Sequence, residues 1–411
     1  MSKIEELIEK LCPDGVEYKK IKETVGLNRG SRLTKSQLIV DGLYEVYHGS
    51  KDTPLGFYNE YNAPKNTTIV VNTGGIGGVK FINKEFWCSD GSFWLGHSKE
   101  IDDKFLYYYI VGFEDYFASQ KRVGGVPTID KSVVEDLEVP VPPMEVQREI
   151  VEILDNFAEL SAEVSAELQA RRKQYEFYRD KLLTFEEPKI EWKTLEEIFD
   201  IKGGYTPSKA NPEYWDNGTI PWFRLEDIRT NGQILEDAKQ HITEKGVKKS
   251  GLFKKDSIIV ATTATIGEHA LIKVAHLCNQ QFTNLTIKNS FIKTLLPKFV
   301  FYYFYIIDKK CFEVVNYSGG IPIVDMSKFK NLLFPIPPLE IQERIVNVLD
   351  NFDTICSDLG IGLPAEIEAR QKQYEYYREK LLTFNPRPIT IFTDRQTDRQ
   401  TDRQTDRQTD R

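Results

Sequence analysis

A long helix-forming segment occurs twice in this chain, once at residues 141–185 and again at residues 336–384. Each copy opens with a Pro-Pro pair and closes with Lys-Leu-Leu-Thr-Phe. Each also follows a block of about 140 residues of mixed, globular composition. Two long helices, each following a globular block, predict internal two-fold organisation. Such a molecule suits a partner that it contacts at two separated places.

Apolar residues recur in steps of three and four along both copies, which is typical of a coiled-coil seam. In the second copy they fall at positions 341, 345, 348, 352 and 355. A continuous helix of about 40 residues would be roughly 60 Å long. We expect Pro143 and Pro338 to lie in the first helical turn. The seam residues proposed to form the spacer or to contact a partner subunit are Gln147, Ile150, Leu154, Phe157, Tyr175, Tyr178, Leu182, Gln342, Ile345, Leu349, Phe352, Tyr374, Tyr377 and Leu381.

The two copies differ in their middle. The first contains a four-residue repeat, Ala-Glu-Leu-Ser and its variants, between Ala158 and Leu168. The second has Gly360-Ile361-Gly362-Leu363-Pro364 at that place. Because proline removes a backbone donor and clashes with the preceding turn, Gly362 and Pro364 are expected to interrupt the second helix.

The two globular blocks share one plan, although most of their side chains differ. Each has a short apolar strand followed by a glycine-containing turn, then an aromatic helix, then a Gly-Gly-(Val/Ile)-Pro turn. The pattern therefore predicts a duplicated scaffold that displays different residues. The corresponding segments are 68–71 and 257–260 for the strand, 74–78 and 265–267 for the turn, 105–111 and 301–305 for the helix, and 124–127 and 319–322 for the last turn.

Net charge and cysteine usage limit the class of protein. The net charge of −8 argues against a stand-alone DNA-binding domain with a basic footprint, although a partner can supply the cations. No apolar run reaches about 18 residues, and residues 1–6 are unlike a secretory signal. The five cysteines are scattered, which predicts reduced thiols. We expect a cytoplasmic protein with no membrane span.

Patterns for catalysis are weak throughout. Asn211-Pro212-Glu213-Tyr214 lacks the second proline of a methyltransferase box, so a turn is the favoured interpretation. The glycines at 74–78 have neither dinucleotide nor phosphate-loop spacing, and the five histidines form no ligand pattern. The aromatic run 301–305 has the residues of a base-stacking platform, but its helical spacing favours a core. We therefore expect a non-catalytic chain without a cofactor or metal of its own.

Loops rich in basic, amide and hydroxyl side chains occur at matching places in both blocks. Such side chains contact phosphates and read base edges. Each loop alone is equally well explained as a solvated turn, and recurrence in both blocks favours DNA. The DNA-contact candidates are Arg29, Ser31, Arg32, Lys121, Arg122, Lys202, Tyr205, Thr206, Ser208, Lys209, Asn279, Gln280, Gln281, Tyr317 and Ser318.

The last 19 residues repeat Thr-Asp-Arg-Gln. A segment without apolar residues cannot build a core, so we expect disorder. The repeat can be encoded by a tetranucleotide, and gain or loss of one unit would then shift the reading frame. Our hypothesis is a phase-variable switch; the alternative is a neutral linker.

The motifs at 142–157 and 172–183, which recur at 337–352 and 371–382, resemble those of the specificity subunit (HsdS) of type I restriction–modification systems. The resemblance implies an α+β fold: two similar mixed α/β target-recognition domains, separated and joined by two long helices packed as an antiparallel coiled coil. It implies that the chain reads double-stranded DNA at a bipartite asymmetric site. It also implies two methyltransferase subunits (HsdM) that use S-adenosylmethionine, and restriction subunits (HsdR) that use ATP and Mg.

The boundaries that follow are 1–142 for the first recognition domain, 143–187 for the central spacer helix, 188–337 for the second domain, 338–385 for the C-terminal helix and 386–411 for the tail. One alternative is a coiled-coil scaffold with duplicated protein-binding domains. Another is a methyltransferase in its own right, which the missing cofactor motif opposes. Basic and amide side chains that converge on one surface would favour DNA, and an apolar patch would favour protein.

Overall fold

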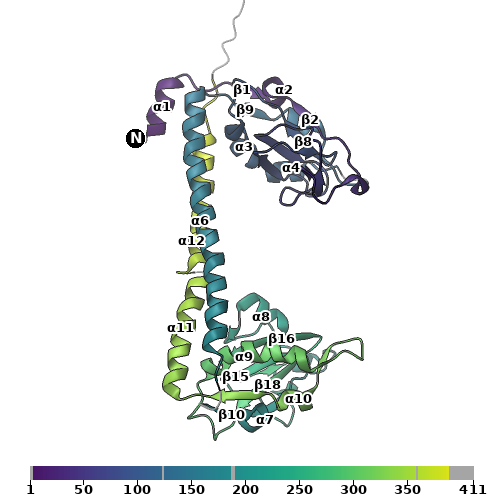
Figure 1. Ribbon diagram of the computed structural model, residues 1–411, viewed down its shortest axis with the longest axis vertical. Helices are drawn as coiled ribbons and strands as arrows, with labels where there is room; N and C mark the ends of the chain where they lie inside the picture. The colour runs from purple at the N-terminus through teal and green to yellow at the C-terminus, as the bar shows by residue number, and fades with distance from the viewer. Residues whose placement is uncertain (1–2, 123–124, 187–189, 358–359, 388–411) are drawn as a thin grey trace, which may run out of the picture. The chain divides into compact units, whose positions relative to one another are not determined.

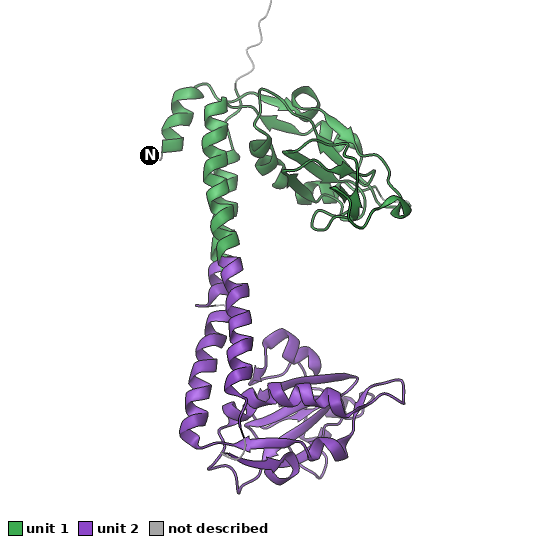
Figure 2. Ribbon diagram, in the orientation of Figure 1, with its two compact units in different colours: residues 1–163, 367–411 green, residues 164–366 purple. Residues whose placement is uncertain are grey.

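The computed structural model describes residues 3–122, 125–186, 190–357 and 360–387 (Figure 1). The chain forms two compact units: unit 1 comprises residues 1–163 and 367–411, and unit 2 comprises residues 164–366 (Figure 2). The predicted tail switch falls outside the described residues. None of the described helices is both long enough and apolar enough to cross a membrane.

Unit 1 is built on a four-stranded sheet of order β2-β8-β5-β6, with a three-stranded sheet β4-β3-β7 and the pair β1-β9 beside it. Its elements are α1 (Lys3–Leu11), β1 (Tyr18–Lys20), α2 (Ile21–Thr24), β2 (Leu27–Arg29), η1 (Lys35–Gln37), β3 (Tyr44–Tyr47), β4 (Gly56–Tyr58), β5 (Thr67–Val71), β6 (Val79–Ile82), β7 (Trp87–Cys88), β8 (Ser92–Leu95), α3 (Asp103–Val111), α4 (Glu114–Ser119), α5 (Lys131–Glu135) and β9 (Glu138–Pro140).

Unit 2 repeats this plan with longer strands. Its main sheet has the order β11-β18-β15-β16-β13, and β20 adds to β15 while pairing with β19. A second sheet has the order β14-β12-β17, and β10 pairs with β21. Its elements are β10 (Glu191–Thr194), α7 (Leu195–Ile198), β11 (Phe199–Gly203), η2 (Pro212–Tyr214), β12 (Ile220–Phe223), α8 (Leu225–Asn231), β13 (Ile234–Leu235), β14 (His241–Ile242), η3 (Glu244–Gly246), β15 (Ser257–Thr263), β16 (Thr265–Ile272), β17 (Leu277–Cys278), β18 (Phe282–Ile287), α9 (Pro297–Cys311), η4 (Phe312–Val314), β19 (Val315–Asn316), β20 (Ile323–Val324), α10 (Met326–Lys330) and β21 (Leu333–Ile336).

The predicted buried strands are confirmed as the central strands β5 and β15. All five residues of β5 and the first six of β15 are buried. The turn that follows differs between the units: residues 72–78 form a loop in unit 1, whereas Ala264, at φ +68°, turns β15 directly into β16. The correspondence of 265–267 with the loop at 74–78 therefore holds in sequence order, but residues 265–267 lie in a strand.

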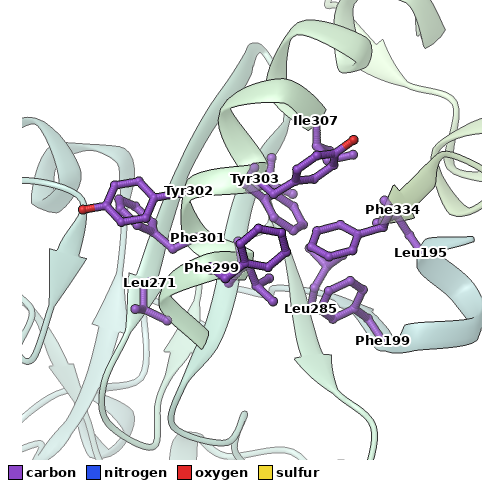
Figure 3. Packing of buried hydrophobic residues seen from close by; sticks show 14 of the residues in the cluster. Leu195, Phe199, Leu271, Leu285, Phe299, Phe301, Tyr302, Tyr303, Ile307 and Phe334 are labelled. Atoms are coloured by element: carbon purple, nitrogen blue, oxygen red, sulfur yellow. The ribbon is translucent and has the colours of Figure 1, made fainter. Parts of the chain in front are cut away.

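The aromatic helix of unit 2 is core, as its spacing favours. Phe299, Phe301, Tyr302 and Tyr303 of α9 are each at most 4% exposed. The rings of Phe299 and Tyr303 pack against Phe334 of β21, whereas that of Phe301 packs against His269 of β16; all four α9 side chains belong to one buried cluster (Figure 3). Because the aromatic side chains point into this cluster, they are not available to stack on bases.

The first long helix is continuous, and the second is interrupted, as expected. Helix α6 (Met144–Leu182) has 39 residues. The second copy ends α11 (Leu339–Ser357) before Gly360 and starts α12 (Leu363–Leu382) after Gly362. Pro143 and Pro338 stand one residue before the helices, where their carbonyl groups accept from the N–H groups of Gln147 and Gln342. The predicted start of each helix was therefore one residue too early.

Aromatic side chains join the helices within each unit. In unit 1 the rings of Phe157 on α6 and Tyr377 on α12 are stacked at 5.2 Å. In unit 2 the rings of Phe352 on α11 and Tyr178 on α6 are stacked at 5.9 Å. The two pairs exchange roles, because each helix copy supplies a phenylalanine to one pair and a tyrosine to the other.

Part of the predicted seam on α11 was wrong. Ile341, Val348 and Ile355 keep 40–42% of their surface exposed. The buried face of α11 carries Ile345 and Leu349, two of the predicted seam residues, which belong to the core of unit 2. The apolar pattern therefore describes two faces: one packs on the globular part, and the other stays partly open.

Unit 1 also joins two distant parts of the chain. The N–H of Val16 donates to the carbonyl of Asn385, and the N–H of Arg387 donates to the carbonyl of Val16. The Tyr18 hydroxyl donates to the carbonyl of Phe384 at 3.1 Å. The segment after α12 thus completes the sheet-bearing part of unit 1.

Candidate functional site

Several loops of unit 1 meet at the end of the central strand β5. The N–H of Ser31 donates to the carbonyl of Cys88 at 2.9 Å, and the N–H of Thr73 donates to the carbonyl of Gly91 at 3.3 Å. Thr73 also forms a bridge with Thr128. We call these residues, namely 29–32, 72–75, 89–91, 121–122 and 125–129, the loop edge of unit 1.

The equivalent loops of unit 2 meet at the end of β15. The N–H of Gly204 donates to the carbonyl of Phe282 at 2.8 Å, and the N–H of Thr262 donates to the carbonyl of Gln281 at 2.9 Å. Thr263 pairs with Ile323. The residues 202–209, 262–264, 279–281 and 315–323 form the loop edge of unit 2. The loops chosen from sequence in the two blocks therefore occupy equivalent places.

One glycine in each unit permits this convergence. A Cβ atom on Gly30 would overlap the carbonyl oxygen of Ser89, and one on Gly204 would overlap the carbonyl oxygen of Asn279. The backbone at these glycines crosses the neighbouring turn at contact distance, which side chains would prevent. The same crossing in both units indicates that the shared scaffold positions the loops.

Most of the basic candidates are available to a partner. Arg29, Arg32, Lys121, Lys202 and Lys209 are exposed, and none has an ion pair within the described ranges. A free cation near an anionic partner gains attraction without first losing an internal one. These five residues therefore suit phosphate contacts better than paired surface cations do.

Arg122 differs from the other basic candidates. Its guanidinium forms an ion pair with the carboxylate of Asp130. Arg122 must give up or share this carboxylate before it can contact a phosphate. We therefore rank it below Lys121 as a DNA contact.

Tyr205 has a structural part in the loop edge of unit 2. Its hydroxyl donates to the carbonyl of Gly246 at 3.2 Å and accepts from the N–H of Lys248 at 2.9 Å. The ammonium of Lys248 lies 4.2 Å from the centre of its ring. Partial burial raises the pKa of Tyr205. Lys248 was missed because it lies 43 residues away in sequence, and only folding places it at this edge.

Tryptophan side chains hold the corresponding loop in both units. The indole N–H of Trp87 donates to the carbonyl of Ser31 at 2.9 Å, and that of Trp215 donates to the carbonyl of Ser208 at 3.0 Å. The two serines are exposed. Within the described ranges neither hydroxyl group has a hydrogen-bond partner, while the backbone of each serine is fixed.

The turn between β17 and β18 presents amide groups of two kinds. Asn279 is 8% exposed, and its side-chain oxygen accepts from the N–H of Gln281 at 3.1 Å. Its amide nitrogen donates to the side-chain oxygen of Gln281 at 3.0 Å. Gln280 is exposed and accepts from the hydroxyl of Thr206. Asn279 thus shapes the turn, and Gln280 presents its amide to solvent.

The matching turn of unit 1 was missed from the sequence. Ser89, Asp90 and Gly91 follow Cys88 as Asn279, Gln280 and Gln281 follow Cys278. The imidazole Nδ1 of His48 lies 3.4 Å from the Asp90 carboxylate. Alignment on the two cysteines would have identified this turn.

The remaining candidates at the loop edge of unit 2 lie on the hairpin β19–β20. Tyr317 is 66% exposed. The N–H and hydroxyl of Ser318 donate to the side-chain oxygen of Asn316 at 2.9 and 2.6 Å. Tyr317 is therefore an exposed ring on a turn that its neighbours order.

Two of the spacer candidates are buried joints between helix and globular part. Gln147 and Gln342 are both 0% exposed. In unit 1, Gln147 donates to the carbonyls of Glu100 and Pro142 at 2.8 and 2.7 Å and accepts from the N–H of Asp102 at 2.6 Å. These bonds leave no surface of Gln147 for a partner subunit.

Gln342 repeats this joint in unit 2. It donates to the carbonyls of Thr294 and Pro337 at 2.8 and 2.7 Å and accepts from the N–H of Leu296 at 2.9 Å. Three backbone groups are satisfied by one amide in each unit, which fixes the helix start against the loop before α3 or α9.

A second joint repeats about two turns further along each helix. Asp155 accepts from Lys104 at 2.7 Å and from the Tyr108 hydroxyl at 2.6 Å. Burial is the main cause that raises the pKa of Tyr108, and the bond to Asp155 adds to it. The sequence comparison did not select these polar groups, although the repeated Leu-Asp-Asn-Phe motif contains the aspartate.

In unit 2, Asp350 accepts from Lys298 at 2.7 Å and from the Tyr302 hydroxyl at 2.6 Å. The polar joint is therefore duplicated group for group. The other spacer candidates lie as follows: Ile150, Leu154, Ile345, Leu349 and Leu381 are buried, and Leu182, Tyr175 and Tyr374 are half-buried.

One aromatic side chain of each helix motif is largely exposed to solvent. Phe177 and Tyr376, the third residues of the repeated Tyr-Glu-(Phe/Tyr)-Tyr motif, are each 62% exposed. Sequence reasoning assigned the neighbouring tyrosines as contacts and missed these two. The helical period gives the signal, because residues 175 and 178 share one face and residue 177 points elsewhere.

The described residues hold no group of three or more metal-ligating side chains. His269 and His276 are buried separately in unit 2. Asn211 caps the short helix η2, as the turn interpretation requires. The five cysteines are free and buried.

Two comparisons of sequence place the chain among known proteins. The family model of the type I restriction modification DNA specificity domain matches residues 13–170 and 189–369. The EcoR124I/EcoR124II specificity subunit of Escherichia coli is 34% identical over 371 residues, which cover 84% of this chain and 88% of that protein. A putative specificity subunit of Haemophilus influenzae is 27% identical and covers 90% of this chain and 96% of its own length.

Solved structures show the same fold. The S subunit of a type I restriction–modification system from M. genitalium aligns over 90% of this chain and 96% of its own, with a TM-score of 0.54 and 19% identity. A chain from a structure of complex assembly in the type I R-M system aligns with a TM-score of 0.63 and 16% identity, over 90% and 98% of the two chains. The predicted α+β fold with two repeated domains is thereby confirmed.

Proposed function

Because this chain belongs to the family of type I restriction modification DNA specificity domains, we propose that it reads one half of a bipartite, asymmetric DNA site with each unit. The expectation of a specificity subunit, rather than a catalytic chain, agrees with the family. The observation that carries the proposal is the convergence of equivalent loops at the end of β5 and of β15, with different side chains on each.

The chemistry of the two loop edges supports DNA as the partner. Free cations contact phosphates without regard to sequence and set the register. Exposed amides such as that of Gln280 offer one donor and one acceptor, which is the pattern that matches an adenine edge. Because the edge of unit 1 carries arginines and an aspartate where that of unit 2 carries glutamines and lysines, the two half-sites are expected to differ.

The helices supply the docking surface for two methyltransferase subunits (HsdM), and restriction subunits (HsdR) join through these. Phe177 and Tyr376 support this part of the proposal, since a large exposed aromatic at the same motif position of both helices suits two copies of one partner. S-adenosylmethionine, ATP and Mg are then bound by the partner subunits, and this chain binds none of them.

Methylome sequencing of a host with and without the gene tests the DNA-reading proposal. We expect one bipartite motif with methylated adenine in both halves that disappears when the gene is deleted. A motif that persists after deletion would contradict the proposal. The repeat tract is tested in the same host by sequencing single colonies, where variable repeat number supports the switch and an invariant tract opposes it.

Stoichiometry tests the docking surface. Native mass spectrometry of the complex should show two methyltransferase subunits per chain. Phe177→Ala or Tyr376→Ala should each remove one of them, whereas Tyr116→Ala, a change at a 45% exposed tyrosine on α4, should remove none. Retention of both subunits in both helix variants would exclude these aromatics as anchors.

An apolar patch on unit 1 favours an additional protein contact. Val40 and Leu43 are 89% and 77% exposed on the segment before β3. Single-turnover methylation by the complex with the double variant V40S/L43S tests it. Loss of methylation or of a subunit supports a protein contact, and full activity with full assembly excludes one within this complex.

A further inference from the structure

The two Gly-Gly-(Val/Ile)-Pro turns place an exposed β-branched residue at the same point of each loop edge. Val126 is 75% exposed and Ile321 is 54% exposed. Each stands two residues before the residue that bridges to the end of the central strand, namely Thr128 to Thr73 and Ile323 to Thr263. The apolar side chain therefore has an equivalent position in both units.

The backbone of unit 2 holds this residue firmly. The hairpin pairs Val315 with Val324 and Asn316 with Ile323. The carbonyl of Pro322 accepts from the N–H of Ala264 at 2.9 Å, which ties the turn to the end of β15. An exposed isoleucine on an anchored turn loses little conformational entropy when a partner covers it.

The glycines of these turns are only partly explained by the fold. Gly125 and Gly320 have φ values of +98° and +77°, a region that favours glycine. Gly319 has no positive φ, and a Cβ atom there would meet no atom within 4 Å. Nothing inside the described chain requires glycine at position 319. A close approach by a molecule outside the chain would require it.

Resting on the proposed function, we propose that Val126 and Ile321 are sequence-independent contacts to the DNA duplex. The apolar side chain packs against the sugars and base stack, and the glycine backbone before it, Gly125 in unit 1 and Gly319-Gly320 in unit 2, admits the phosphodiester chain. The residue type is shared by both units while the base-reading side chains around it differ. A group that serves two different half-sites has to recognise what the half-sites share, which is the duplex itself.

The test uses the complex with its methyltransferase subunits, a duplex that carries the mapped motif, and a scrambled duplex. Ile321→Ser should weaken binding to both duplexes by the same factor, at least about tenfold, because it removes three side-chain carbon atoms from an apolar contact. The methylated motif should stay the same. Ile292→Ser is the matched control, since Ile292 is 58% exposed and follows the far end of β18.

Gly319→Ala provides a second variant that the fold tolerates. Its thermal unfolding should match that of the unsubstituted chain, and its affinity for both duplexes should fall. Unchanged affinity in both variants overturns the proposal, and so does a loss confined to the motif duplex, which would make Ile321 a base reader. If Lys202→Ala also leaves both affinities unchanged, the loop edge itself is wrong; if it weakens them, only the present proposal fails.

Discussion

Unit 1 buries Phe86 at the position where unit 2 buries His276, and both side chains are 0% exposed. The bridges of these residues correspond, since Phe86 pairs with Ala63 and His276 with Phe253. The ring of His276 lies 5.6 Å from the rings of Phe223 and Phe253, so it occupies an aromatic site. The scaffold tolerates either ring, but only that of unit 2 can take up a proton.

A second position shows the same divergence. In unit 1 the carboxylate of Glu114 accepts from the N–H of Val79 and from Lys51, each at 2.7 Å. In unit 2 the buried carboxylate of Asp308 pairs with His269 at 2.5 Å. Burial raises the pKa of Asp308, and the His269 partner opposes that rise. The acid at this position is thus satisfied by different groups in the two units, whereas the glutamine and aspartate joints to the helices are repeated unchanged.

The two units therefore share the hydrogen bonds that join each helix to its globular part, but not the side chains of the core and of the loops. Gln147 and Gln342 form the same three bonds, because each must fix a helix start to a globular part. Interior packing depends on volume and shape, so a phenylalanine and a neutral histidine are exchangeable there. The loops are exposed, and their sequences are constrained mainly by what they contact.

The largest effect should come from the glutamine joints. Gln147→Leu and Gln342→Leu each leave two carbonyls and one N–H without a partner, which costs about 4 kcal/mol. We expect equal losses, each localised by hydrogen exchange to its own unit. Gln169→Leu, a change at an exposed position of α6, is the control. Clearly unequal losses would show that the joints are not equivalent.

Acid sensitivity should separate the two units next. Burial lowers the pKa of His276 from 6.5 to about 4. The unfolded chain therefore binds the proton first, and the stability of unit 2 is full above about pH 6.5 and falls as the pH drops through 4. The difference between the pKa of His276 in the unfolded and folded chain corresponds to about 3 kcal/mol in the free energy of unfolding.

His276→Phe should abolish this slope and make unit 2 resemble unit 1. Phe86→His should introduce it into unit 1. Denaturant unfolding followed by unit-specific hydrogen exchange at pH 7 and pH 4.5 measures both. Acid sensitivity that survives His276→Phe would assign it to groups other than His276.

A smaller effect is expected from one amide at one loop edge. Gln280→Ala should relax one position in a single half-site, at a cost of about 2 kcal/mol for the correct base. Methylome sequencing of the variant would show a degenerate position in that half and an unchanged second half. Degeneracy in both halves would break the assignment of one unit to one half-site.

The smallest change in stability is expected from a deletion in the spacer helix α6. Deletion of Ser161–Val164 shortens α6 by about 6 Å, which is at most two base pairs. We expect an altered gap between the half-sites, with both half-sites intact. The mapped motif gives the answer directly: an unchanged gap would exclude α6 as a ruler.

Sequence patterns predicted most of the architecture for a physical reason. Periodicity and proline placement act locally. The 39-residue helix α6, the break near Gly362 and the buried strand β5 could therefore all be predicted from the sequence. Because the scaffold is duplicated, each element could be predicted from two copies of its sequence. The buried face of α11 was harder to predict, because the spacing of apolar residues alone does not tell which of two faces a helix buries.

The candidate site was predicted only in part. Matching loops were found because they repeat, but the turn at Ser89–Gly91 and the cation Lys248 enter the loop edges through contacts between distant segments. The burial of Gln147 could not be predicted either. From the sequence alone a glutamine in a helix is expected at the surface, and its three backbone partners are known only from the folded structure.

The amino-acid sequence by itself determined that the chain is a duplicated scaffold with two long helices, because repetition and helical period are properties of order along the chain. Tertiary structure decided which loops share an edge, which polar groups are joints and which aromatics remain open. These properties depend on contacts between residues that are far apart in sequence, and only the packed core brings such residues together.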